Sequence, residues 1–178
     1  VILDVDGTLI DSNDAHARAW VDAGSRLGYE IVFDEVRRLI GMGGDRVMPM
    51  VAGIEESSPE GQELKELRGE IFRRHYLPHL EPLPRVRELL LRLRDDGFER
   101  VVASSASEED LGLLLDRAGV ADLIDSATSA SEADESKPEP DIVEAAVGKA
   151  RVARERLLMI GDTPYDVEAA RRARVPII

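Results

Sequence analysis

The chain has 178 residues, 43% of them hydrophobic, so it can bury the core of one domain that carries a sizeable insertion. Its 36 acidic and 23 basic residues give a formal charge of −13, which argues against nucleic acid as a partner because binding a phosphate backbone requires clustered Lys and Arg. The chain has no Cys for disulfides or thiolate metal sites and no apolar run long enough to span a membrane, so we expect a cytoplasmic protein without a membrane partner.

Short apolar segments alternate with longer amphipathic ones along most of the chain, a pattern typical of βαβ units. The apolar segments predict buried strands at residues 1–3, 101–103, 157–160 and 175–178, with a weaker strand at 124–129. The amphipathic segments predict helices at residues 84–96, 108–118, 140–149 and 164–174. We therefore expect an α/β fold with a doubly wound, Rossmann-like parallel sheet that has helices on both faces.

One interval departs from this alternation. About a hundred residues separate the first two predicted strands, far more than a single crossover helix needs. Within it, helical spacing of apolar residues recurs at 15–27, 35–40, 45–51 and 60–76. Pro82 and Pro84 restrict the backbone where the chain would return to the sheet. We predict a core of residues 1–12 and 81–178 with an inserted α-helical cap of residues 13–80.

The first strand ends in two carboxylates, Asp4 and Asp6, whose spacing makes them project to the same side. Both would lie at the carboxyl edge of the sheet, where open α/β sheets bind ligands. Gly7 permits a tight turn with amides that face an anion, and Thr8 follows it. One carboxylate could attack phosphorus while the other exchanges a proton with the leaving oxygen and with water. Taken alone, the pair is also explained as turn formers at a strand end.

Polar side chains also follow the second strand and open a later helix. Ser104 and Ser105 end the second strand, where either hydroxyl could bind a phosphoryl oxygen or cap a helix. Lys137 precedes a proline in a loop, where it could neutralise Asp4 and a bound phosphate, although most lone lysines are solvated surface charges. A hydroxyl and a cation thus accompany the carboxylates.

A second acidic pair, Asp162 and Asp166, follows the predicted strand at 157–160. With Asp4, a backbone carbonyl and waters, Asp162 could complete a site of hard oxygen ligands for Mg²⁺. Asp166 lies in the first turn of the next helix, where a carboxylate also suits the helix dipole. The sequence leaves open whether Asp166 belongs to the site or only begins the helix.

The four ordered motifs of the haloacid dehalogenase-like hydrolases resemble segments of this chain, namely Asp4-Val5-Asp6-Gly7-Thr8-Leu9, Ser105, Lys137-Pro138, and Gly161-Asp162 through Asp166. The order and spacing fit over nearly the whole chain, and family members commonly insert a helical cap after the first motif. The resemblance implies an enzyme of the capped phosphatase type.

Roles for individual residues follow from the same resemblance. It implies that Asp4 is the nucleophile and Asp6 the general acid/base. Ser105, favoured over Ser104, would bind phosphate, and Lys137 would balance charge. Gly7 and Thr8 would belong to the substrate-binding residues. Mg²⁺ would be held by Asp4, Asp162 and the backbone carbonyl of Asp6.

The predicted cap offers two further candidates for substrate binding, His16 and Arg46. His16 resembles a cap histidine of β-phosphoglucomutase-like members, but Gly44 stands where such a mutase has a phosphate-binding arginine, and Arg46 lies two residues on. Glu108 likewise stands where a lysine would be expected. Because a second phosphate would lose two cations, hydrolysis is favoured over the mutase alternative. His16 also has a simpler explanation, as a polar surface residue of an amphipathic helix.

We therefore expect Mg²⁺-dependent hydrolysis of a small phosphorylated metabolite by a monomer or weak homodimer. The alternatives are the mutase and a non-catalytic phospho-acceptor or binding module. A phospho-acceptor signalling domain would lack the long insertion after the first acidic strand. Because the chain begins at Val1 and ends within an apolar segment, we also expect that its ends are trimmed.

Overall fold

A computed structural model describes residues 1–178 and contains one parallel sheet of four short strands in the order β3-β2-β1-β4. All three neighbouring pairs are parallel. The strands are β1 (Ile2–Leu3), β2 (Val101–Ala103), β3 (Ser126–Thr128) and β4 (Met159–Ile160). The predicted parallel α/β fold is confirmed.

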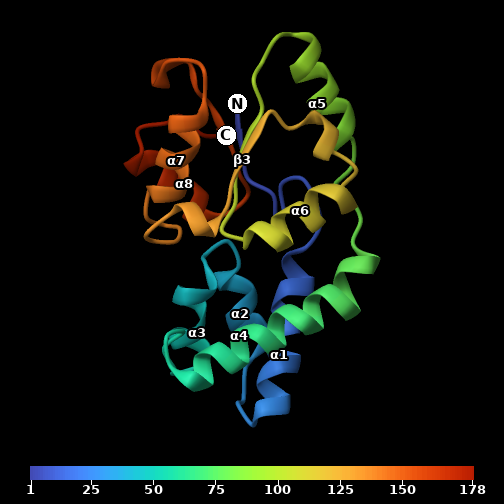
Figure 1. The fold of residues 1–178 in the computed structure, drawn as a ribbon, viewed down its shortest axis with the longest axis vertical. Helices are drawn as coiled ribbons and strands as arrows, with labels where there is room; N and C mark the ends of the chain where they lie inside the picture. Colours follow the sequence, from blue (N-terminus) through green and yellow to red (C-terminus); the bar gives the residue numbers. More distant parts are fainter.

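Four helices cover the two faces of this sheet: α5 (Val86–Asp95), α6 (Glu108–Arg117), α7 (Asp141–Lys149) and α8 (Pro164–Arg172). Ile2 lies opposite Val101 in the register, and their row of side chains packs with α7 and α8. The next row, Leu3 and Val102, packs with α5 and α6 on the other face. Figure 1 shows the two helix pairs on opposite sides of β3. Alternation along each strand therefore produces the doubly wound arrangement.

The last apolar segment, at residues 175–178, differs from its predicted strand. It runs beside β4, where the Met159 amide donates to the Pro176 carbonyl at 2.7 Å and the Ile178 amide donates to the Met159 carbonyl at 3.1 Å. Only an isolated bridge between Met159 and Ile177 results. Pro176 has no amide hydrogen, which limits the ladder that this segment can form.

The long insertion is helical, as its apolar spacing predicts. It comprises α1 (Asn13–Leu27), α2 (Phe33–Leu39), α3 (Gly44–Ala52) and α4 (Pro59–Ile71), followed by a π-helical turn (Phe72–Tyr76) and a 3₁₀ turn (Leu77–His79). In Figure 1 these helices gather below the sheet, beyond the carboxyl ends of the strands. We call this part the helical insertion. That residues 13–80 form a separate cap, and residues 1–12 with 81–178 a core, stays a prediction.

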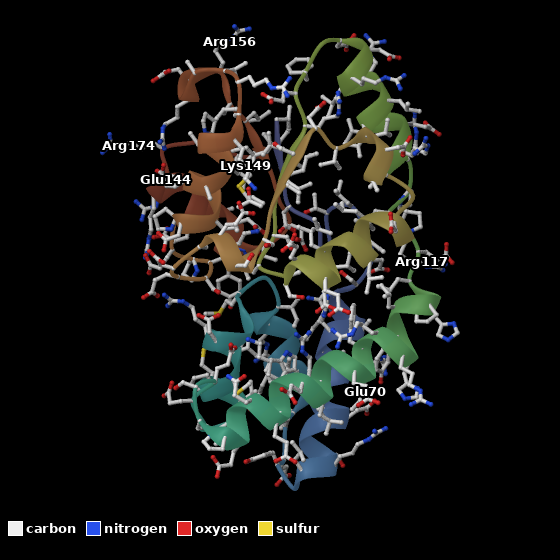
Figure 2. All side chains as sticks on the ribbon, in the orientation of Figure 1. Glu70, Arg117, Glu144, Lys149, Arg156 and Arg174 are labelled. Carbon is white, nitrogen blue, oxygen red and sulfur yellow. The ribbon has the colours of Figure 1, made fainter.

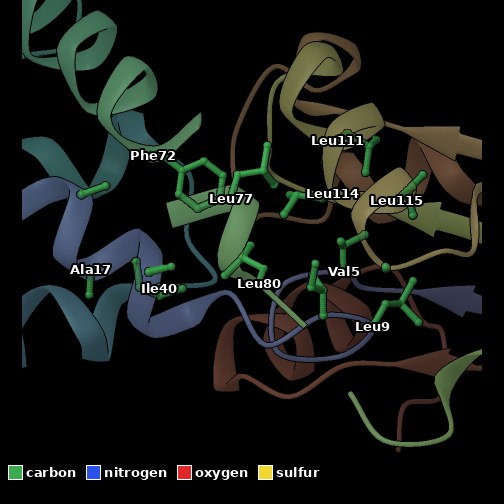
Figure 3. Packing of buried hydrophobic residues seen from close by; sticks show 14 of the residues in the cluster. Val5, Leu9, Ala17, Ile40, Phe72, Leu77, Leu80, Leu111, Leu114 and Leu115 are labelled. Carbon is green, nitrogen blue, oxygen red and sulfur yellow. The ribbon is translucent and has the colours of Figure 1, made fainter. Parts of the chain in front are cut away.

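One cluster of 28 buried residues joins the helical insertion to the sheet. Phe72, Leu77 and Leu80 lie in the segment that returns from the insertion, and they belong to the same cluster as Val5 and Leu9 of the loop after β1 (Figure 3). Because this apolar contact is continuous, the insertion is seated against the carboxyl edge of the sheet.

Charged side chains lie mainly on the outside of the molecule, as Glu70, Arg117, Arg156 and Arg174 illustrate (Figure 2). None of the helices combines the length and the apolar composition that crossing a bilayer would require.

Candidate active site

The loop after β1 makes a tight turn at Gly7, whose φ is +81°. The amide of Leu9 donates to the Val5 carbonyl at 2.8 Å and closes the turn. A Cβ atom on residue 7 would lie 2.2 Å from both Asn13 Nδ2 and Asp162 Oδ2. Glycine is therefore needed both for its positive φ and for the space it leaves. The turn brings α1 and the β4 end of the sheet against Asp4 and its neighbours.

Lys137 is held at the centre of the site with 1% of its surface exposed. Its Nζ donates to Asp4 Oδ1 at 2.6 Å, to Asp166 Oδ1 at 2.7 Å and to the Ala103 carbonyl at 3.0 Å. Three acceptors match the three donors of an ammonium group, which fixes the position of this lysine. The structure therefore brings Lys137 into direct contact with Asp4, as the sequence predicts.

The charges in this cluster do not balance. Burial raises the pKa of Asp4 to about 8, although the Lys137 ammonium acts in the opposite direction. Burial alone would lower the pKa of Lys137, but the charges of Asp4 and Asp166 outweigh it and raise that pKa. One ammonium serves two buried carboxylates, so a further cation near Asp4 would stabilise its ionised form.

Asp166 has two roles that the sequence alone could not separate. Its Oδ2 accepts from the Thr163 amide at 3.1 Å and from the Thr163 hydroxyl, while its own amide donates to Thr163 Oγ1 at 3.2 Å. This reciprocal capping box begins α8. Its Oδ1 meanwhile accepts from Lys137. Asp166 therefore both starts the helix and belongs to the buried charge cluster.

Three carboxylates could hold a metal ion together: Asp4, Asp162 and Asp166 each offer an oxygen within 4.8 Å of the others. Burial raises the pKa of Asp162, although the 2.9 Å hydrogen bond from Asn13 opposes this. A compact set of hard oxygen donors with excess negative charge fits Mg²⁺. The sequence predicted Asp4 and Asp162 as ligands, with the backbone carbonyl of Asp6 as the third.

The Asp6 side chain faces the helical insertion. Its Oδ1 accepts from the Ser12 hydroxyl and lies 2.8 Å from His16 Nε2. Burial favours the protonated form of Asp6, but His16 and Ser12 outweigh that effect and lower its pKa. The His16 ring stacks on Phe72, with centroids 4.0 Å apart and planes 10° apart. Two elements of the insertion thus hold the second carboxylate in place.

The two serines after β2 have different surroundings. Ser104 is fully buried, and its Oγ accepts from the Ala106 amide at 3.1 Å. Ser105 lines the cavity described below, and its buried Oγ has no hydrogen-bond partner. A buried hydroxyl without a partner is costly and is suited to receive a ligand oxygen. Of the two serines, Ser105 thus has the hydroxyl that is free to bind a ligand, and its role as a phosphate ligand stays a prediction.

A cavity of about 440 Å³ opens between the sheet edge and the helical insertion. Asp4, Asp6 and Ser105 line its sheet side, and Trp20 and Arg68 line it from the insertion. Gly7 and Thr8 lie beside Asp162 instead, with Thr8 Oγ1 3.5 Å from Asp162 Oδ1. Their assignment as substrate-binding residues stays a prediction.

Arg46, the predicted cap cation, lies outside the lining of this cavity. Its guanidinium pairs with Glu135 and lies 3.7 Å from Glu139, so it bridges α3 to the loop that contains Lys137. Its role in substrate binding stays a prediction. His16, the other cap candidate, lies in the cavity wall.

Sequence reasoning missed two residues of the site, Asn13 and Arg68. Asn13 holds Asp162 from the start of α1. Arg68 could have been found from helix periodicity, because it is itself half-buried and shares the helical spacing of the buried Leu64 and Ile71 in α4. A charged residue within an apolar stripe indicates a polar function for that position.

Comparison with known proteins agrees with this geometry. The family model described as haloacid dehalogenase-like hydrolase matches residues 1–178. A phosphoglycolate phosphatase of Aquifex aeolicus is 32% identical over 97% of this chain and 80% of its own length. A Caldanaerobacter subterraneus protein, named for a proposed pyrophosphatase activity, is 31% identical over 98% of this chain and 78% of its own.

A solved structure extends the likeness to the fold. A hydrolase from Pseudomonas syringae superimposes with a TM-score of 0.90 at 26% identity, covering 99% of this chain and 81% of that one. The match spans both the sheet and the helical insertion. The chain therefore belongs to the haloacid dehalogenase-like hydrolases.

Proposed function

We propose that this hydrolase is a Mg²⁺-dependent phosphatase that cleaves a small phosphorylated metabolite through a phosphorylated Asp4. The observation that carries the proposal is the setting of Asp4. Its Oδ1 is bound by the buried Lys137 at 2.6 Å, while its side chain lines the cavity. A carboxylate held in one orientation beside a cation suits attack on an electron-poor phosphorus.

The proposed reaction has two steps. In the first, an Asp4 oxygen forms a bond to phosphorus as the bond from phosphorus to the leaving oxygen breaks, and Asp6 gives that oxygen a proton. In the second, Asp6 takes a proton from water, whose oxygen attacks the phosphoryl group and releases Asp4 and inorganic phosphate. Asp6 thus regains its proton in each cycle. Its contact with His16 keeps the carboxylate at the cavity wall.

Ser105 and Lys137 would stabilise the transferred group. The unpartnered Ser105 hydroxyl can donate to a phosphoryl oxygen, and the Lys137 ammonium offsets the charge that builds up beside Asp4. Asp4 and Asp162 would hold Mg²⁺ with the Asp6 backbone carbonyl, and Asp166 lies near enough to assist. When bound, the ion supplies positive charge that draws the phosphoryl group to the site and offsets its negative charge.

The substrate is proposed to be small. A cavity of about 440 Å³ suits a compact metabolite. Phosphoglycolate heads the substrates to be tested, because relatives of 32% and 29% identity are named phosphoglycolate phosphatases. The name of the Caldanaerobacter relative adds pyrophosphate to the panel. The cytoplasmic location and the monomeric or weakly dimeric state remain predictions.

The test is phosphate release from a panel of small phosphorylated metabolites with Mg²⁺, comparing the native protein with Asp4→Asn. Asn keeps the shape of the side chain but lacks a nucleophilic carboxylate oxygen. We expect release by the native protein alone. If no substrate is cleaved, glucose 1-phosphate isomerisation with a bisphosphate activator tests the mutase alternative. A failure there too would favour a binding module.

A further inference from the structure

Arg46, a cation of the helical insertion, contacts the loop that carries Lys137. It lies in the first turn of α3, and its guanidinium pairs with Glu135 and lies 3.7 Å from Glu139. These two carboxylates stand two positions before and two positions after Lys137 in the chain. The insertion therefore binds the sequence neighbours of the central cation of the site.

The two ends of this loop are held differently. Arg172 of α8 pairs with Glu139, and the Glu139 amide donates to the Ser136 carbonyl at 3.1 Å, so groups outside the insertion hold the far end. At the near end, the Glu135 amide donates to Asp141 at 2.9 Å. The Glu135 side chain is 60% exposed, and Arg46 is the one cation that pairs with it. Only the near end thus depends on the insertion.

A close contact between backbone and side chain adjoins the ion pair. Gly43, just before α3, lies against Ser136, the residue that precedes Lys137. A Cβ atom on residue 43 would lie 2.0 Å from Ser136 Oγ and 2.5 Å from Ser136 Cβ. The φ of Gly43 is −72°, which any residue adopts, so glycine is needed here for the space beside Ser136. The insertion therefore touches the loop at two successive positions, 135 and 136.

The position of this loop matters because Lys137 reaches the site from it. The Lys137 ammonium donates to two carboxylates and a backbone carbonyl at distances between 2.6 and 3.0 Å. A shift of the loop would lengthen these bonds, and misplacing an active-site group by about an ångström can cost about a hundredfold in rate. An ion pair as exposed as that of Arg46 contributes little to stability. Its effect should therefore appear in the position of Lys137.

We propose that Arg46 is a positioning residue, which holds Glu135 and thereby keeps Lys137 in contact with Asp4. The expected effect on rate rests on the proposed phosphatase function. The competing role is the one predicted from sequence, in which Arg46 binds the substrate directly.

Kinetics separate the two roles. In Arg46→Met, kcat for the best substrate of the panel should fall about threefold to tenfold while KM stays nearly unchanged, because the variant misplaces Lys137 and removes no substrate contact. The matched control is Arg37→Met, which breaks a pair with Asp14 inside the insertion and should keep the native kcat. An unchanged kcat in Arg46→Met, or a rise in KM alone, would overturn the inference.

Exchange of the two charges gives a sharper test. Arg46→Glu and Glu135→Arg each place like charges opposite one another, and each should lower kcat. The double variant restores an ion pair and should recover most of the lost kcat. A substrate contact would not be recovered, since position 46 would still lack a cation, so a double variant as slow as Arg46→Glu would contradict the positioning role. Arg46→Lys keeps the charge and should retain more kcat than Arg46→Met, which guards against misfolding of the doubly substituted chain.

Chemical labelling provides a readout that does not depend on turnover. The Lys137 side chain is 1% exposed, whereas those of Lys65 and Lys149 are 50% and 34% exposed. Acetylation with acetic anhydride, mapped by mass spectrometry, should spare Lys137 in the native protein and in Arg37→Met. In Arg46→Met it should label Lys137 at least about threefold faster relative to the other two lysines, because the loop opens more often.

The two readouts distinguish the possible failures. If the native protein cleaves nothing, the proposed function fails, and labelling still tests the positioning role. If Lys137 stays as protected in Arg46→Met as in the native protein, the Arg46 inference fails.

Discussion

The two walls of the cavity differ in how their charges are matched. On the sheet side, Lys137 donates to Asp4, Asp166 and a backbone carbonyl, so all three of its donors are used. On the side of the helical insertion, Arg68 has a long contact to His16 and no carboxylate partner. Buried charges are tolerated when paired, and the cation of the sheet side is paired while the half-buried Arg68 forms no ion pair.

This difference assigns separate tasks to the two parts of the molecule. The sheet edge holds groups whose positions cannot vary, as chemistry at phosphorus requires. The insertion contributes His16 and Arg68 to the facing wall of the cavity. Catalysis should therefore depend most strongly on substitutions at the sheet edge, and the following experiments test that side of the cavity.

The largest effect is expected from removing the central cation. Lys137→Met should abolish phosphate release and lower the free energy of unfolding by about 3–5 kcal/mol, because it leaves Asp4 and Asp166 buried without their partner. Urea denaturation and the phosphate assay measure the two effects. The control, Arg172→Met, breaks a surface pair with Glu139 and should scarcely move the urea midpoint. A stable, active Lys137→Met protein would contradict the importance of the buried cluster.

Removal of Mg²⁺ should stop turnover without unfolding the protein. Chelation is expected to end phosphate release, and added Mg²⁺ to restore it. Mg²⁺ should also raise the melting temperature of the native protein, because a ligand that binds only the folded state stabilises it. Asp162→Asn should weaken that rise. Full activity in chelator would remove the metal from the proposed reaction.

Gly7→Ala tests the turn after β1, which brings Asn13 of α1 close to Asp162 after β4. The added Cβ would meet Asn13 and Asp162 at 2.2 Å, so it must displace Asp162. We expect about a hundredfold loss of kcat/KM, the scale typical of misplacing an active-site group by about an ångström. Mg²⁺ titration should reveal a weaker apparent affinity. Unchanged affinity would indicate that Asp162 does not bind the ion.

The smallest effects separate the two neighbouring serines. Ser105→Ala should lower kcat/KM roughly tenfold to a hundredfold with little change in stability, since its hydroxyl has no partner to lose. Ser104→Ala should lower the free energy of unfolding by about 1 kcal/mol, because its Oγ accepts from the Ala106 amide. The reverse pattern, with activity lost only in Ser104→Ala, would move the phosphate contact to Ser104.

The sheet side of the site was predictable from sequence because topology alone brings it together. Asp4, Ser105 and Asp162 each follow a short apolar strand, and the carboxyl ends of parallel strands meet at one edge. Lys137 reaches Asp4 from a loop, and the resemblance to the family motifs identified it. The helices were also predictable from their periodicity, although the end of 60–76 forms a π-helical turn instead.

The insertion side was less predictable, because its contacts depend on how separate helices dock. Arg46 follows a Gly-rich loop and was predicted to face the substrate, yet it pairs with Glu135, which lies 89 positions along the chain. Arg68 was overlooked although it shares the helical spacing of the buried Leu64 and Ile71, because its contacts with His16 and Trp20 depend on how α4 docks against α1. The two roles of Asp166 could be recognised only in the three-dimensional structure, because its helix cap and its hydrogen bond to Lys137 use different oxygens.

The most direct test of the account is whether the phosphoryl group is transferred to Asp4. The native protein with Mg²⁺ and the best substrate of the panel would be quenched in acid during turnover, digested and mapped by mass spectrometry. We predict a phosphorylated peptide whose modification lies on Asp4, and no such peptide from Asp4→Asn. Phosphate release without a modified Asp4, or undiminished release by Asp4→Asn, would contradict the account.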